Sequence, residues 1–523
     1  WLTESKLSDA ADRGITVTEI AAMDQPIDAA PETTAAFVGR ALRGPLNTPV
    51  LVHTFGDFRR RFGDVWSRSS LGPAVKQFFD HGGRNLFVVR VANNARGALI
   101  CLPASGSALV LRAVEPGSTE CVRVAIDYDG IDPGNDELFN LTLQRVDPDT
   151  LLVTDQELYR KLSYREEADS FVADALLVSS LVRVEKPFPS HRPEATTPAD
   201  SSSGSSYVDH AQDGTDGHEL SDYDLVGSRP EGRGIFALDQ VDQFDILYLP
   251  PPGKGIDTGP AAVLAAERYC RSRGAMLIVD PSAAVETPEA MMREVREQGY
   301  ASPNLVGYFP RLSVRGHGNT APRAVGAAIA GLLCKLDRMY GPWQALDQQG
   351  LGLSREFAPA VIIDEDDARV LVREGINVIV PGPAGKARVT GSTTMARGSE
   401  MQRPLSSLAV RRLCLRIVNS IEQATRWAVF EPVDETLAQR IRSQVFAFLS
   451  ALVDMDAFMN DRIDVQCDAG LRGTPAGSGQ GISILISFQP HGCEKPISLT
   501  LHQSAKGFRV ASTAFAPVNG DCA

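Results

Sequence analysis

The residue types of a serine hydrolase are all present in the chain. Such an enzyme needs a nucleophilic serine, a histidine base beside it and a carboxylate that orients the histidine. His317 lies in RGHGNTAP, Ser392 lies in VTGSTTM, and Asp245 or Asp280 could supply the acid. No Gly-Thr-Ser turn precedes a small-residue helix, however, and the stretch AVGAAIAGLL after His317 is typical of a helix packed closely on a sheet. We therefore interpret His317 as a solvated histidine and expect no catalytic residue.

Phosphate-binding and metal-binding motifs are incomplete. Residues 251–255 read PPGKG, which lacks the first glycine of a P-loop, and Gly255 stands where that loop has its magnesium-binding hydroxyl. The acidic run at residues 364–367 is typical of a loop before a helix, where carboxylates favour the helix N-terminus. The histidines show no H-x-x-x-H spacing and the 8 cysteines no C-x-x-C spacing, which favours reduced, mostly buried thiols. We expect no cofactor and no metal.

The composition describes a large, acidic, globular chain. Its 523 residues are too many for one ordinary core and predict about three or four domains. A formal net charge of −13 and a pI near 5.2 argue against a nucleic-acid partner, which usually requires a basic face. No apolar run approaches the roughly 20 residues that span a bilayer, so we expect no direct membrane insertion. The sequence begins at Trp1 and not at Met, and we expect residues upstream of it.

Strands alternate with helices after residue 235, which indicates a parallel sheet covered on both faces. The expected strands are residues 244–249, 275–280, 305–309, 360–363 and 378–380, and the expected helices are residues 259–273, 287–297, 321–336 and 366–374. Gly274 and Gly375 follow two of these helices, at a position where a left-handed residue commonly ends a helix.

The segment 34–91 has the same character. It predicts strands at residues 35–38, 49–52 and 86–91, with helices at residues 55–62 and 71–79. We expect it to join the same sheet, which makes the α/β domain discontinuous.

The region between the two α/β segments is expected to be a β-rich insertion that faces outward. Short β-rich runs separated by Gly and Pro turns occur at residues 108–113, 121–127, 138–145 and 176–184. The tract at residues 186–227 has almost nothing to bury and predicts a mobile or disordered loop.

The chain after residue 401 predicts an α+β domain. An apolar face recurs at helical spacing between residues 410 and 424, and Asp434 is placed to cap a second helix. Strands are expected at residues 482–488 and 497–501.

These segments resemble the contractile tail sheath proteins of bacteriophages and related injection systems. In that family the opening segment has a G-P turn, an F-x-D-F…F-G element and a helix ending in F-F-x-N-G-G before V-V-R-V; this chain has TAAFVGRALRGP, FGDFRRRFG and FFDHGGRNLFVVRV. The stretch RRLCLRIVNSIEQATRWAVFEPVDETLAQRIRSQVFAFL resembles the C-terminal pattern of the family, R-R…S-I…W-x-V-F-E-P-N-D…L-W-x-x-I-R…F-L. It departs at Val433 and Ala438, where the family commonly has Asn and Trp. The resemblance covers residues 34–91, 235–400 and 401–510, and it leaves the insertion unmatched.

The resemblance implies a multidomain α/β fold: a discontinuous subtilisin-like α/β core domain with a β-rich insertion, an α+β C-terminal domain and extended terminal arms. The expected parts are an N-terminal arm (1–32), the first part of the core (33–97), the inserted outer domain (98–234) with its disordered loop (about 186–227), the second part of the core (235–400), the C-terminal sheath domain (401–507) and a C-terminal arm (508–523).

The implied function is structural, not enzymatic. The chain would be a subunit of a contractile tail sheath that polymerises helically around an inner tube and contracts to drive that tube through a target envelope. The implied partners are further copies of the chain, the inner tail tube protein, and baseplate and tail terminator or cap proteins. The implied location is a virion tail or contractile particle assembled in the bacterial host cytoplasm.

The resemblance also implies terminal arms that add strands to the C-terminal sheets of neighbouring subunits. The donating residues lie in the two arms, and the accepting residues alternate along one strand of the sheet: Ile15, Val17, Ile20, Phe508 and Val510 donate, and Ile482, Ile484, Ile486 and Phe488 accept. A tube-facing surface is expected on the polar faces of the two C-terminal helices, where arginines gather in an otherwise acidic chain: Arg411, Arg412, Arg416, Arg440 and Arg442. The alternative for each arginine is an ordinary solvated helix face.

Two other functions stay open at this point. One is a hydrolase of subtilisin-like ancestry, which the missing nucleophile turn disfavours. The other is a sheath component of a type VI secretion apparatus, which divides its sheath between two smaller chains, whereas this single chain carries arms, core and C-terminal domain together.

Overall fold

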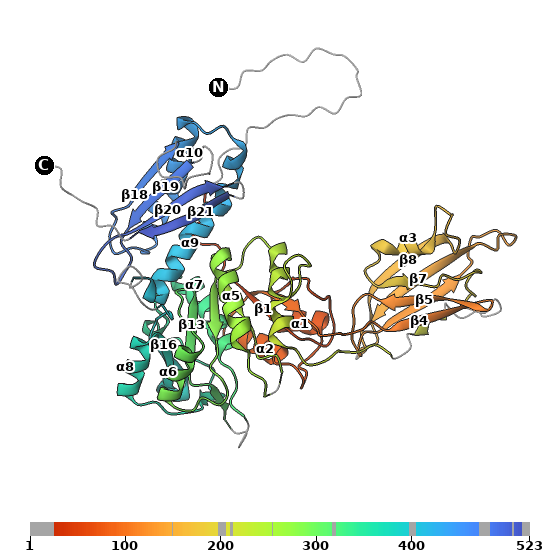
Figure 1. Ribbon diagram of the computed structural model, residues 1–523, viewed down its shortest axis with the longest axis horizontal. Helices are drawn as coiled ribbons and strands as arrows, with labels where there is room; N and C mark the ends of the chain where they lie inside the picture. The colour runs from red at the N-terminus through yellow and green to blue at the C-terminus, as the bar shows by residue number, and fades with distance from the viewer. Residues whose placement is uncertain are drawn as a thin grey trace, which may run out of the picture. The chain divides into compact units, whose positions relative to one another are not determined.

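The structure is a computed structural model, and it describes residues 26–148, 150–196, 206–209, 213–253, 255–315, 321–396, 404–469, 482–504 and 507–514 (Figure 1). The chain divides into two compact units. The larger unit comprises residues 30–419 and 490–495; the smaller comprises residues 1–29, 420–489 and 496–523.

An eight-stranded sheet forms the centre of the larger unit, in the order β17-β16-β13-β12-β11-β1-β3-β2. The strands from β16 to β3 run parallel, and β17 and β2 are antiparallel strands at the two edges. Their bounds are β1 (Thr34–Gly39), β2 (Val50–Val52), β3 (Asn85–Arg90), β11 (Ile246–Tyr248), β12 (Met276–Val279), β13 (Leu305–Phe309), β16 (Ile376–Pro381) and β17 (Ala387–Thr390). The opening segment therefore joins the same sheet as the strands after residue 245, as the sequence predicted.

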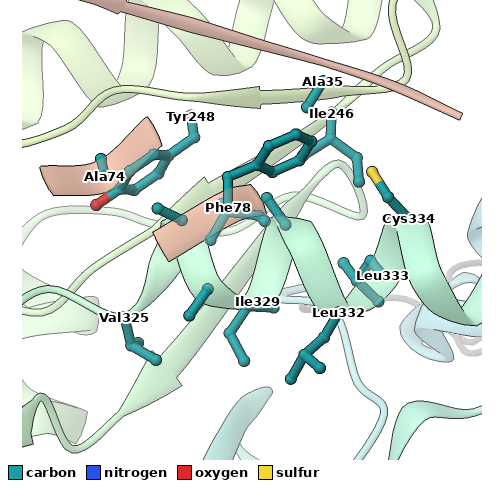
Figure 2. Close-up of a cluster of buried hydrophobic side chains, with 14 of the residues drawn as sticks. Ala35, Ala74, Phe78, Ile246, Tyr248, Val325, Ile329, Leu332, Leu333 and Cys334 are labelled. Carbon is teal, nitrogen blue, oxygen red and sulfur yellow. The ribbon is translucent and has the colours of Figure 1, made fainter. Parts of the chain in front are cut away.

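Helices cover both faces of this sheet and enclose two hydrophobic cores. One core holds side chains of α1 (Phe55–Phe62), α2 (Leu71–Asp80) and α7 (Gly326–Tyr340). The other holds side chains of α5 (Pro260–Arg273), α6 (Pro288–Glu297) and α8 (Glu365–Arg373). Figure 2 shows side chains of α7 gathered against Phe78 of α2 and Tyr248 of β11.

The small residues of α7 permit this close packing. A Cβ atom on Gly331 would lie 2.3 Å from the carbonyl oxygen of Phe78, so the backbones of α2 and α7 approach each other closely at that point. His81, which follows α2, holds the same junction. Its Nε2 accepts from the backbone N–H of Ser354 at 3.0 Å, and its Nδ1 therefore carries the proton and donates to the carbonyl of Gln77 at 2.7 Å. The expected packing role of the glycine- and alanine-rich helix is confirmed.

Local signals at helix ends agree with the structure. The side chain of Asp364 accepts from the N–H of Asp367 at 2.8 Å and caps α8, as expected of the acidic run. Gly274 ends α5 in the left-handed conformation, with φ 67° and ψ 34°. The prediction of a strand at residues 360–363 is wrong. The short β15 (Phe357–Pro359) precedes these residues and pairs with β14 (Leu312–Val314) outside the large sheet.

The insertion is β-rich and folds as two small sheets around a shared core. One sheet has the order β10-β6-β7-β8 and the other β4-β5-β9, with α3 (Val172–Ala175) beside them (orange to yellow in Figure 1). The strands are β4 (Leu99–Ala104), β5 (Ser107–Ala113), β6 (Val122–Asp127), β7 (Leu138–Val146), β8 (Val153–Ser163), β9 (Val182–Glu185) and β10 (Val208–Asp209). The predictions from sequence missed β4, β8 and β10, and the expected run at 176–184 is a 3₁₀ turn (Leu176–Val178) followed by β9.

Much of the tract at residues 186–227, which was expected to be a disordered loop, is ordered in the structure. Only residues 197–205 and 210–212 lie outside the described residues there. Arg192 stacks over Tyr128 at 3.8 Å, and residues 222–226 form the helix α4 (Asp222–Val226). Leu220 and Leu225 are buried in the core of the large sheet. Few but well-placed apolar residues therefore order much of a tract whose composition indicated disorder.

The smaller unit packs a long helix on an antiparallel sheet of order β18-β19-β20-β21 (blue in Figure 1). The strands are β18 (Asp464–Ala469), β19 (Ile482–Phe488), β20 (Ile497–Ser504) and β21 (Gly507–Ala514), and the helix is α10 (Glu435–Asp454). Asp434 caps α10 by accepting from the N–H of Leu437 at 2.7 Å, which confirms the predicted cap. The preceding helix, α9 (Leu408–Ala424), contributes residues to both units.

Candidate functional site

The carboxylates considered for a hydrolase are engaged in holding the fold. Asp280 accepts from the backbone N–H groups of Val325 and Gly326, each at 2.9 Å, at the N-terminus of α7. Its other oxygen accepts from the hydroxyl of Tyr248 at 2.5 Å, and burial raises the pKa of that tyrosine. Asp245 accepts from the N–H of Thr34 at 2.9 Å. Among the described residues, Asp245 is thus held by a strand of the sheet and Asp280 by Tyr248 and the N-terminus of α7; His317 lies outside the described residues.

The loop at residues 251–255 does not form a phosphate cradle in its described part. Gly253 pairs with Ile256 across a tight turn, and Lys254 lies outside the described residues. The pocket beside this loop has a volume of about 20 Å³, which suits a single water and no phosphate. Within the described ranges, no three His, Cys, Asp or Glu side chains are grouped to hold a metal ion. A membrane-spanning helix is likewise not found among the described helices.

The three arginines predicted to face the tube from α9 lie inside the larger unit. Arg411 is half-buried and donates to Asn304 Oδ1 at 2.7 Å, and desolvation of its guanidinium lowers its pKa. Arg412 and Arg416 are each only 6% exposed. Arg412 forms an ion pair with Asp337 of α7, whose side chain is 5% exposed.

Arg416 binds the segment that leads into β1. One of its terminal nitrogens donates to the carbonyl of Pro31 at 2.6 Å and the other to the hydroxyl of Thr33 at 2.8 Å. That hydroxyl donates in turn to Asp337. Arg412 and Arg416 therefore tie α9, α7 and the start of β1 together, and as placed in this subunit they present no charge to a tube.

A sequence signal for this role existed. Arg412 and Arg416 are four residues apart and flank Leu413 and Ile417 of the apolar stripe, so they lie next to the buried face of the helix. The partner acid, Asp337, was not recognised because it is distant in sequence.

The two arginines of α10 lie in the smaller unit, on different sides of the helix. The guanidinium of Arg440 lies 4.6 Å from the ring centroid of Trp427. Arg442 is exposed and donates to the carbonyl of Val465 in β18 at 2.9 Å. Residues two apart on a helix do not face the same direction, so a single partner surface cannot lie flat against both.

The predicted accepting strand lies inside the C-terminal sheet and not at its edge. β19, the predicted accepting strand, pairs with β18 on one side and with β20 on the other. Its residues Ile482, Ile484, Ile486 and Phe488 are all buried in the unit. Among the described strands of this sheet, the free edges belong to β18 and β21. β19 therefore offers no free edge in this subunit, because it has a partner on each side, and its assignment as the acceptor stays a prediction.

The predicted C-terminal arm begins as a strand of the same sheet. β21 pairs antiparallel with β20 of its own chain, with Val510 opposite Leu501 and Phe508 opposite Gln503. The N-terminal donors Ile15, Val17 and Ile20 lie outside the described residues.

Comparison with solved structures identifies the fold. A tail sheath protein of Listeria innocua matches with a TM-score of 0.60 at 14% identity, over 91% of this chain and 96% of its own. A tail sheath protein of Desulfitobacterium hafniense matches with a TM-score of 0.53 at 12% identity, over 93% and 99%. The contracted sheath of the extracellular contractile injection system PVC matches with a TM-score of 0.52 at 12% identity, over 92% and 95%. No family model and no curated protein matches the sequence. The chain therefore has the fold of contractile sheath proteins.

Proposed function

We propose that this chain, with its contractile-sheath fold, is the structural subunit of a contractile sheath that polymerises helically around an inner tube. The observation that carries the proposal is the extent of the match: more than nine-tenths of this chain and of each sheath protein named above correspond. The match thus includes the α/β unit and the C-terminal unit together. The chain acts through its interfaces and is not an enzyme; Asp245 and Asp280, the acids that a hydrolase would need, support the sheet and a helix N-terminus.

Strand addition to the C-terminal sheet is the proposed joint between subunits. Among the described strands, β18 and β21 form the edges of this sheet, and sheet edges present backbone groups of the kind that accept an added strand. The alternating segment with Ile15, Val17 and Ile20 is the proposed donor. β21, which follows β20 after a short connection, is the second segment that could pair with a neighbour in place of its own sheet.

The proposed tube contact rests on the arginines of α10. The acidic chain carries Arg440 and Arg442 on a helix of the smaller unit, and complementarity to an acidic tube would guide co-assembly. The proposed partners further include the baseplate and the tail terminator or cap proteins. The proposed location is a virion tail or contractile particle assembled in the bacterial host cytoplasm. The core is proposed to be of the subtilisin-like type, with the β-rich insertion facing outward.

Negative-stain electron microscopy of the purified full chain tests polymerisation. Hollow, ridged cylinders are expected. A chain lacking residues 1–20 is expected to remain a folded monomer by circular dichroism and to form no cylinders. A matched pair separates the two faces of the arm: Ile15→Asp with Val17→Asp should block assembly, whereas Thr16→Asp with Thr18→Asp should not. Normal cylinders from the truncated chain would refute the strand-addition joint.

Co-assembly with the tube protein tests the arginines one at a time. Arg440→Glu and Arg442→Glu are compared with Arg369→Glu, an exposed charge reversal on α8. Loss of tube binding in an α10 variant alone would identify the side of the helix that meets the tube. Unchanged binding in both α10 variants would count against the charge-complementarity proposal.

A further inference from the structure

One side of α10 borders a groove within the smaller unit. Its volume is about 570 Å³, which lies in the range of pockets that accept a ligand, roughly 300–1,000 Å³. The lining combines one stripe of the helix with the residues at which the described chain begins: Pro26, Ile27, Thr436, Gln439, Arg440, Ser443, Gln444, Ala447, Phe448 and Ala451. The spacing of 436, 440, 443, 447 and 451 is that of a single helix face.

The position of Ile27 shows that the N-terminal chain already lies against this helix. Ile27 is only 8% exposed, and it lines the groove together with Phe448. Residues 1–25 precede it and lie outside the described residues. The described chain therefore begins at the groove itself.

The chemistry of the groove suits an extended peptide. Ala447 and Ala451 supply apolar surface, whereas Thr436, Gln439 and Ser443 supply groups able to hydrogen-bond to a backbone. Arg440 adds a positive charge to the lining. The segment GITVTEIAAMDQ, residues 14–25, carries apolar Ile15, Val17, Ile20 and Met23, the acids Glu19 and Asp24, and no basic residue.

The lengths also agree. Residues 436–451 span about 22 Å at the rise of an α-helix. Residues 14–20 span about 20 Å if they are extended at the rise of a β-strand. Residues 21–25 connect this segment to Pro26, so the segment would meet the groove at the high local concentration that a short tether creates, on the order of millimolar.

We propose that, in the unassembled subunit, residues 14–20 of the same chain lie along α10 in this groove. The segment proposed above to pair with a neighbouring sheet must then leave its own subunit before it can do so. Its departure uncovers the side of α10 that carries Arg440. This second step rests on the proposed strand exchange, whereas the docking itself rests on the groove alone.

A cysteine pair tests the docking in the full chain at concentrations too low for polymerisation. Val17→Cys is combined with Ser443→Cys, which lines the groove, or with Phe446→Cys, which is 49% exposed on the same helix but does not line it. After mild oxidation, peptide mapping by mass spectrometry separates the designed bond from bonds to native cysteines. We expect the bond between positions 17 and 443 in monomers, at a yield roughly five or more times that of 17 and 446, because a docked tether raises local concentration.

Two results would overturn the docking. Equal yields for the two pairs would show that the segment does not prefer the groove. Bonds found only between two chains, with a yield that rises with concentration, would show that a second copy fills it.

A variant that fills the groove tests the same proposal while the two crosslinked positions stay the same. Ala447 is exposed on the helix, so Ala447→Trp should leave the unit folded while it excludes the segment. Added to the 17/443 pair, it should lower the bond yield to the level of the 17/446 pair; an unchanged yield would contradict docking in the groove. In an otherwise native chain it should shorten the lag before cylinders appear, and an unchanged lag would overturn the coupling to assembly. Absence of cylinders from the native chain, with the 17/443 bond present, would refute the sheath function and leave the docking in place.

Discussion

Replacing Arg412 by methionine separates a structural role for the α9 arginines from a tube-binding role. The ion pair of Arg412 with Asp337 is almost completely buried, with side chains 6% and 5% exposed. When Arg412 is lost, Oδ2 of Asp337 keeps one hydrogen bond, from the hydroxyl of Thr33. Oδ1 of Asp337 has no hydrogen-bond partner among the described residues. Methionine retains most of the apolar stem of arginine, so the change chiefly removes the charge.

The expected loss is large because an uncompensated buried carboxylate remains. Breaking a buried pair on one side costs about 3–5 kcal/mol. The larger unit has about 400 residues, so its unfolding entropy is about 0.8 kcal/mol/K, and Arg412→Met should lower its thermal midpoint by roughly 4–6 °C. Arg442→Met, at an exposed residue with one hydrogen bond to the carbonyl of Val465, should cost about 1 kcal/mol or less.

Scanning calorimetry of the full chain, below its polymerisation concentration, measures both variants. Adding Asp337→Asn to Arg412→Met removes the orphaned charge and keeps an acceptor for Thr33, so this double variant should recover much of the lost stability. A midpoint within about 2 °C of the native chain for Arg412→Met, together with lost tube binding, would refute the structural role. A double variant as unstable as the sum of its single changes would refute the pairwise explanation.

Three further changes test the packing and the caps. Gly331→Ala places a Cβ atom 2.3 Å from the carbonyl oxygen of Phe78 and should destabilise the larger unit by about 1–3 kcal/mol. The control Gly56→Ala, on the exposed side of α1, should be neutral or stabilising. Equal thermal midpoints for the two variants would contradict the close packing of α2 and α7. Burial lowers the pKa of His81 below its ordinary value of 6.5. Between these two pKa values the unfolded chain binds more protons than the folded chain, so the free energy of unfolding should fall as the pH drops from 6.5 through the lowered pKa. His81→Gln should flatten this dependence, and an unchanged pH profile of the midpoint would exclude His81 as its source. Asp434→Ala should cost about 1 kcal/mol in the smaller unit, measured by urea unfolding, because it removes the N-cap of α10; no change would show that the cap is dispensable.

Much of the secondary structure could be predicted because its causes are local. The spacing of apolar residues, the capping aspartates and Gly274 act within a few residues of the chain. Accordingly, α1 and α5 begin and end close to the expected positions, and α10 begins at its predicted cap. The alternation of strands and helices likewise indicated the parallel sheet, since connections between parallel strands are usually helical. The resemblance to contractile sheaths was also readable from short motifs at both ends of the chain.

Pairing and burial could not be predicted from the same signals, because both depend on residues that are far apart in sequence. The order of the C-terminal sheet, in which β18 and β21 pair with β19 and β20, is not encoded in the pattern of any one strand. β19 lies between β18 and β20 in this subunit, a position that its alternating pattern did not indicate. Arg412 is charged, which by itself indicates a surface residue, yet Asp337 allows it to be buried. The sequence by itself therefore determined the elements and the family resemblance, whereas only the tertiary structure decided which edges and which charges remain at the surface, because a residue's exposure is set by the partners that folding brings to it.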